Sequence, residues 1–210
     1  MTDTHKDKLH RYLVRTRASV LWKVEGLSEY DLRRPLTVTG SNLLGLVKHL
    51  AIVESRYFGE SFGRPFTPHL PWWDDDQPAD GDMWATADES SAEILSTYRA
   101  VTAHADETIA ALDLDAPGNV SWWPRPEVTL HSVLVHVVVE TARHAGHVDV
   151  LREQLDGRVG DWAPDPAEAV SAPSEEDERR WAEHRARVEA AAREGEKAAA
   201  GAWSGPAANR

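Results

Sequence analysis

The chain has 210 residues, a formal net charge of −12 and no cysteine. This length allows one domain with a sizeable core plus an appendage. The lack of cysteine excludes disulfides, thiolate metal sites and a cysteine nucleophile, so any metal ligands must come from His, Asp and Glu. Lys and Arg are dispersed among the acids, which disfavours nucleic acid and anionic membrane as partners. A neutral or cationic small molecule, or a protein, suits this surface better.

The amino-terminal residues MTDTHKDKLHRYLV are charged and have no apolar region of the kind found in signal peptides. No later stretch approaches the roughly 20 consecutive apolar residues that a membrane span requires. The sequence therefore predicts a cytoplasmic protein without a membrane segment.

Four segments carry apolar residues at the three-and-four spacing of a buried helix face. They are residues 4–25, 41–59, 86–112 (or 88–112) and 129–155. Ser41 is the expected N-cap of the second helix, and Gly157 lies just beyond the fourth. No segment shows the alternation of a β-strand, so the sequence predicts an all-α four-helix bundle over residues 1–160.

The remaining segments are punctuated by proline, glycine and acidic residues. Residues 60–86 fit no regular element, and a connection this long in a compact domain is usually functional. Residues 161–173 are typical of a linker, and Ser174 begins a charged helix over about 175–195. We expect the final fifteen residues to be disordered.

The fourth helix combines two features that rarely occur together. Its valines and leucines lie around most of its circumference, which predicts that it is buried. Five ionisable residues nevertheless share a stripe of about 100° of arc. They are His136, Glu140, Arg143, His144 and His147. Burying such groups without partners costs several kcal/mol or more, so the stripe requires a metal ion, mutual pairing or a hydrated cavity.

Three residues form the predicted metal site. Glu140 and His144 are four residues apart, a spacing at which both side chains reach one ion, and His49 is the only histidine of the second helix. Two imidazoles and a carboxylate with one open position suit catalytic zinc, and iron(II), nickel and manganese accept the same ligands. The structural alternatives are a hydrogen-bonded core histidine at His49 and a helix-surface pair at Glu140 and His144.

Two motifs resemble the DinB-like superfamily, specifically its mycothiol-dependent transferase branch. They are SNLLGLVKHLAIVE (41–54) and HVVVETARHAGHVDVLREQLDG (136–157), and the resemblance spans roughly residues 5–160. It implies a four-helix bundle with a His, His/Glu, His metal triad, which agrees with the site predicted from spacing. Many members have histidine where this chain has Glu140, and glutamine where it has His147. A glutamate at the former position is similar to the mycothiol-dependent maleylpyruvate isomerase pattern.

The resemblance implies a metal-dependent thiol S-transferase that acts on a small electrophile. The metal would bind mycothiol or a similar thiol and lower its pKa. His49, Glu140 and His144 would hold the ion, while Arg56, Arg143 or His147 would orient the thiol or move a proton. Trp72, Trp73, Trp122 and Trp123, all in predicted loops, would wall the pocket.

Two other functions use the same residues. A metal-bound hydroxide would hydrolyse a small substrate. Alternatively, the metal would only stabilise a bundle that forms a homodimer or binds a hydrophobic ligand. Neither the residue types nor their spacing separates these alternatives from thiol transfer.

Overall fold

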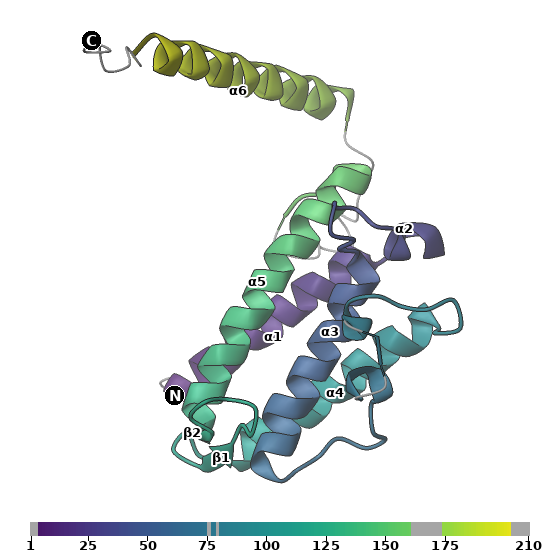
Figure 1. Ribbon diagram of the computed structural model, residues 1–210, viewed down its shortest axis with the longest axis vertical. Helices are drawn as coiled ribbons and strands as arrows, with labels where there is room; N and C mark the ends of the chain where they lie inside the picture. The colour runs from purple at the N-terminus through teal and green to yellow at the C-terminus, as the bar shows by residue number, and fades with distance from the viewer. Residues whose placement is uncertain (1–3, 75–76, 79, 161–173, 203–210) are drawn as a thin grey trace, which may run out of the picture. The chain divides into compact units, whose positions relative to one another are not determined.

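The computed structural model describes residues 4–74, 77–78, 80–160 and 174–202, and the chain divides into two compact units, 1–163 and 164–210. The first unit is mostly helical, which confirms the predicted all-α class (Figure 1). Its helices are α1 (His5–Val24), α2 (Glu29–Arg33), α3 (Leu43–Glu54), α4 (Ser91–Ala111) and α5 (Leu130–Asp156).

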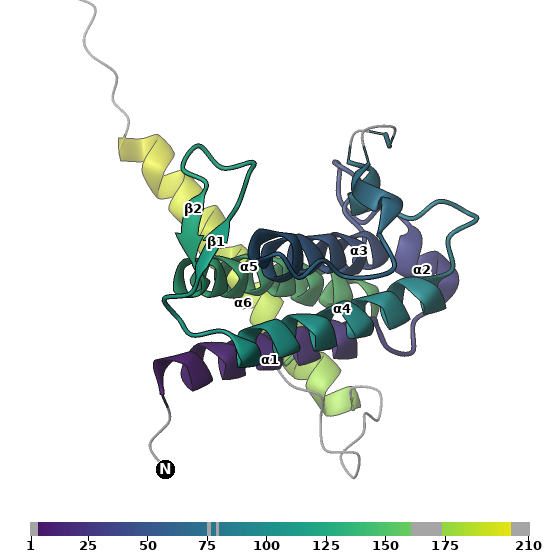
Figure 2. The ribbon, with the colours of Figure 1, turned by 90° about the horizontal axis from the view of Figure 1, so that it is seen from below.

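The four long helices pack as a bundle in which α1 lies along α5 and α3 lies along both α4 and α5 (Figures 1 and 2). Their apolar faces form two core clusters. Leu46, Leu50 and Val148 belong to one, and Leu13 and Leu134 belong to the other. All of these side chains are fully or almost fully buried. The core therefore holds α3 and α5 side by side, with their inner faces opposed.

Polar side chains fix where the helices begin. Thr129 accepts a hydrogen bond from the Ser132 backbone N–H at the start of α5, and Gly157 ends that helix with a left-handed φ of 73°. The predicted N-cap Ser41 is wrong by one residue. Asn42 is the cap of α3, because its Oδ1 accepts from the Gly45 backbone N–H at 2.8 Å.

Several predicted boundaries differ from the structure. The second predicted helix is α3 followed by a π-helical turn (Ser55–Gly59) and a 3-10 turn (Glu60–Phe62), while α4 begins only at Ser91. Two short features were not predicted from the sequence: the five-residue α2 and a small antiparallel hairpin of β1 (Pro117–Asn119) and β2 (Glu127–Thr129). Three-residue strands are too short to show an alternating pattern.

After the Glu60–Phe62 turn, the described residues of the connection to α4 contain only two single 3-10 turns, Pro71–Trp73 and Gly81–Met83. The second of these turns is held against α3. The buried Lys48 ammonium donates to the Gly81 and Trp84 carbonyl oxygens at 2.8 and 3.0 Å. At Gly45, a Cβ atom would lie 1.7 Å from the Met83 carbonyl oxygen. Only glycine therefore permits this close approach.

The prediction that α5 is buried on nearly all sides is wrong. Val135, Val139 and Val150 are exposed, and Val139 is 56% accessible. Packing against α1 and α3 covers the inner face of α5 but leaves these valines toward solvent. Composition alone overstated the burial, because valine supplies apolar surface on whichever side the neighbours leave uncovered.

The second unit contains α6 (Glu175–Ala202), which starts at the predicted position but runs past residue 195 into the segment predicted to be disordered. The Ser174 hydroxyl accepts from the Asp177 backbone N–H at 3.1 Å. The predicted linker 161–173 and the last eight residues lie outside the described part of the chain. No described helix has an apolar stretch long enough to cross a membrane.

Candidate metal centre

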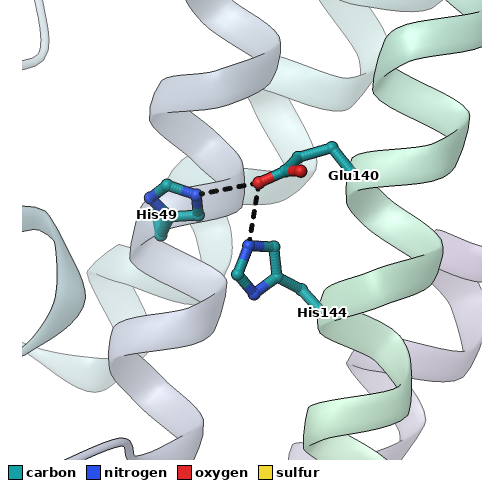
Figure 3. A group of neighbouring side chains, drawn as sticks. All are labelled: His49, Glu140 and His144. Carbon is teal, nitrogen blue, oxygen red and sulfur yellow. Dashed lines mark hydrogen bonds and ion pairs between the residues drawn. The ribbon is translucent and has the colours of Figure 1, made fainter.

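The three predicted ligands converge between two helices. His49 projects from α3, and Glu140 and His144 project from successive turns of α5 into the same space (Figure 3). His144 Nε2 lies 3.0 Å from Glu140 Oε1, and His49 Nε2 lies 3.7 Å from the same oxygen. One ligand atom from each residue falls within 4.8 Å of the other two.

These separations suit a single small cation. Zinc forms bonds of about 2 Å to imidazole nitrogen and carboxylate oxygen, so two ligands of one ion lie about 3 to 4 Å apart. Only small side-chain movements are needed to bring the three atoms to that spacing. The sequence-derived pairing of residue 49 with residues 140 and 144 therefore corresponds to real proximity across the α3–α5 interface.

The environment favours the forms of these side chains that bind a cation. Burial lowers the pKa of His144, and the nearby His49 lowers it further, so its imidazole is neutral near pH 7. For Glu140, burial alone would raise the pKa, but the His144 hydrogen bond and neighbouring basic groups outweigh it, and the pKa is lowered. A neutral imidazole and a carboxylate are the ligating states.

Asp82, which no sequence pattern predicted, completes the arrangement. Its Oδ2 lies 2.6 Å from His49 Nδ1, and the residue is only 5% exposed. When His49 carries its proton on Nδ1, this N–H donates to Asp82. The lone pair of His49 Nε2 then faces Glu140 and His144. Carboxylate partners of this kind orient metal-binding histidines. The only signal in the sequence was the length and acidity of the connection that carries Asp82.

The contacts of Lys48 explain how Asp82, a loop residue, reaches His49. Lys48, next to His49 in the sequence, binds the carbonyls of Gly81 and Trp84 on both sides of Asp82. Lys48 also pairs with Glu89 at 2.7 Å. The Gly81–Met83 turn is therefore fixed to the same helix that carries His49, so the aspartate and the histidine are held together.

A cavity of about 250 Å³ opens beside the three residues. Its lining residues are His49, Ile52, Val53, Arg56, Tyr57, Trp73, Trp122, His136 and Glu140. Two of the four predicted wall tryptophans are among them. Trp123 instead donates its indole N–H to the Tyr57 hydroxyl at 3.0 Å, and Trp72 packs against the Lys48 ammonium.

The remaining predicted site residues divide into two groups. Arg56 and His136 line the cavity. Arg143 and His147 are exposed on α5 and do not line it, although the His147 ring lies 5.4 Å from that of His144. Asn42, which caps α3, does not line the cavity either.

The π-helical turn after α3 places two of the lining residues. Arg56 and Tyr57 belong to the Ser55–Gly59 segment, where the chain departs from the α-helical hydrogen-bond pattern. Such insertions change the direction of the side chains that follow and are frequent at functional sites. Helical periodicity alone could not have placed these residues relative to His49.

Comparison with known proteins identifies the family of the chain. No curated protein matches the chain. The family model described as mycothiol-S-transferase matches residues 8–157, which include all three predicted metal ligands and every residue that lines the cavity. Because this match covers well over half of the chain, it confirms the resemblance found in the two sequence motifs. The chain belongs to the mycothiol S-transferase family.

Proposed function

We propose that this protein is a metal-dependent mycothiol S-transferase in which His49, Glu140 and His144 hold one divalent ion. The convergence of these three side chains across the α3–α5 interface is the observation that carries the proposal. Zinc is the metal we expect first, and iron(II), nickel and manganese accept the same nitrogen and oxygen ligands. A bound ion would lower the pKa of a coordinated thiol and so supply a thiolate near neutral pH.

The residues of the chain supply position and surroundings. Asp82 orients His49, and the aromatic rings of Trp73 and Trp122 line the adjacent cavity and reduce its access to water. Burial lowers the pKa of His136, so its imidazole is neutral and can accept the proton that the thiol loses. The Tyr57 and Trp123 rings pack on His136 at 4.8 and 4.9 Å and hold it in place.

Family membership favours thiol transfer over the two alternatives. Hydrolysis by a metal-bound hydroxide and a purely structural metal would both use the same three ligands. Only thiol transfer also accounts for the family match, and the chain has no cysteine of its own to act as a nucleophile. We assign Arg143 and His147 no step, since both lie outside the cavity.

Removal of the metal should abolish the activity. We expect zinc-loaded protein to accelerate the reaction of mycothiol with iodoacetamide, treatment with a chelator to eliminate the acceleration, and added zinc to restore it. The measurement is the enzyme-dependent rate of iodide release, with metal content determined on the same samples. Protein that carries a full equivalent of metal and gives no rate above that of mycothiol alone would contradict the proposal.

Replacement of Asp82 should weaken metal binding without unfolding the protein. Asp82→Asn removes the carboxylate that fixes the His49 tautomer, so we expect the affinity for zinc to fall about 10- to 100-fold. Competition with a chromophoric chelator measures this affinity. Asp74→Asn is the matched control, because Asp74 contacts the exposed His69 at 2.7 Å in the same connection and does not line the cavity beside the three ligands. Equal affinities for Asp82→Asn and the wild type would exclude the orienting role.

A further inference from the structure

Arg56 brings a positive charge into the cavity beside the metal centre. Its side chain is 19% exposed. The guanidinium carbon lies 3.9 Å from the Trp122 ring centroid and 5.2 Å from that of Trp73. Contacts with two indoles fix the guanidinium plane and remove much of its water.

Arg56 uses fewer of its hydrogen-bond donors than the two buried arginines, Arg17 and Arg152. Arg17 uses Nε and both terminal nitrogens in contacts to Glu54 and Asp106. Arg152 likewise uses all three nitrogens, binding two backbone carbonyls and Asp156. Arg56 donates only through Nε, at 3.3 Å, to the half-exposed Glu60.

The two terminal nitrogens of Arg56 therefore remain available. Neither makes a hydrogen bond to any residue in the described part of the chain, and neither is among its fully buried unpaired atoms. A partly desolvated guanidinium with free donors is costly unless a ligand supplies the acceptors. The two parallel N–H groups of such a fork match the two oxygens of a carboxylate.

From this geometry we propose that Arg56 binds a carboxylate on the electrophile, so that the preferred substrates are small electrophiles carrying a carboxylate. The inference rests on the proposed transferase function and names its substrate class. His49, at the metal centre, and Arg56 line the same cavity. A small molecule in the 250 Å³ cavity can thus place its carboxylate at Arg56 and its reactive carbon toward the proposed metal centre.

This assignment changes two expectations from the sequence. The net charge of −12 favoured a neutral or cationic ligand, but a local arginine in a cavity decides the ligand charge more strongly than the average over the surface. Arg56 was expected to orient the thiol or move a proton. We propose that Arg56 instead binds the second substrate, the electrophile, for which iodoacetate is the simplest probe. When iodoacetate reacts, a bond forms between the thiolate sulfur and the CH2 carbon of iodoacetate, and iodide leaves with the electron pair of the C–I bond.

The first test measures binding without chemistry. Butyrate and butyramide have nearly the same shape, and only butyrate carries a charge. We expect the fluorescence of the tryptophans beside Arg56 to report a Kd for butyrate at least about tenfold lower than for butyramide. Arg56→Gln should eliminate this difference. Equal affinities in the wild-type protein would overturn the proposal.

The second test compares turnover of iodoacetate and iodoacetamide with mycothiol, each corrected for its uncatalysed rate. Arg56→Gln should lower the ratio of kcat/KM for iodoacetate to kcat/KM for iodoacetamide about tenfold or more, mainly by raising the KM for iodoacetate. Arg56→Lys, which keeps the charge but not the fork, should give an intermediate ratio. Glu60→Gln removes the competing carboxylate and should raise the ratio. Arg99→Gln makes the same charge change on the exposed side of α4 and should leave the ratio unchanged.

The outcomes separate this inference from the proposed function. A protein that prefers butyrate but turns over neither iodo compound would refute the transferase and retain the carboxylate site. Turnover of both compounds with an equal loss in Arg56→Gln would show that Arg56 acts on the thiol or on the fold, and would overturn the inference while leaving the transferase in place. A ratio unaffected by Glu60→Gln and by Arg56→Lys would also overturn it.

Discussion

Replacement of His144 by alanine should eliminate stoichiometric metal binding while α5 stays helical. The substitution removes one of three ligands, and the remaining pair, His49 and Glu140, cannot hold a divalent ion tightly against water. Alanine is the best helix former, so the helix itself tolerates the change. Metal analysis after dialysis should give well under one equivalent of zinc per chain, and far-ultraviolet circular dichroism should remain close to that of the wild type.

His131→Ala is the matched control, because it makes the same substitution at an exposed histidine on the same helix. This variant should retain the full wild-type equivalent of zinc. If His144→Ala also retains a full equivalent, the ligand assignment is wrong, whatever activity the protein shows. A loss of metal in both variants would point to a general effect on α5 and would likewise contradict the assignment.

Replacement of Arg17 by methionine should cause a large loss of stability. Glu54 is completely buried on α3, and the Arg17 guanidinium binds both of its carboxylate oxygens and also contacts Asp106 on α4 at 2.6 Å. Removing one partner of a buried ion pair leaves an uncompensated charge and typically costs about 3 to 5 kcal/mol. The free energy of unfolding, measured with urea at neutral pH, should fall by this amount.

The pH dependence of this loss has a definite sign. Burial raises the pKa of Glu54 above its ordinary value, and the Arg17 charge opposes that increase in the wild type. Without Arg17 the folded variant binds a proton more tightly than the unfolded chain, whose carboxyl pKa is about 4.3. The free energy of unfolding of Arg17→Met should therefore decline as the pH rises above about 4.3. The difference in this free energy between the wild type and the variant should become smaller as the pH falls toward about 4.3.

Two further variants test whether the pairing itself matters. Arg17→Met combined with Glu54→Leu removes both charges and should recover much of the lost stability, because an apolar pair carries no desolvation penalty. Arg34→Met removes a partly exposed pair with Asp31 and should have only a small effect. If Arg17→Met destabilises the protein no more than Arg34→Met does, the buried network is not a stability determinant.

Helical periodicity was sufficient to predict which three residues converge in the candidate site. Glu140 and His144 share a face because they are four residues apart on one helix, and His49 lies on the inner edge of an apolar stripe. Both of these placements depend on helix geometry and on which face is apolar, and the spacing of residues in the sequence indicates both. The all-α class followed from the same periodicity, and two motifs sufficed to recognise the family.

The tertiary structure alone decided the surroundings of that centre. Asp82 reaches His49 because Lys48 binds the Gly81–Met83 turn and Gly45 leaves room for it. This turn lies 33 or more residues further along the chain, and helical periodicity does not relate positions so far apart. The orientation of Arg56 depends on a π-helical turn and on two indoles from separate loops. The sequence by itself determined which residues share a helix face, since that depends on neighbours three or four residues away. Which of those side chains meet, and which stay without a partner, depends on contacts between distant segments that form only when the chain is folded.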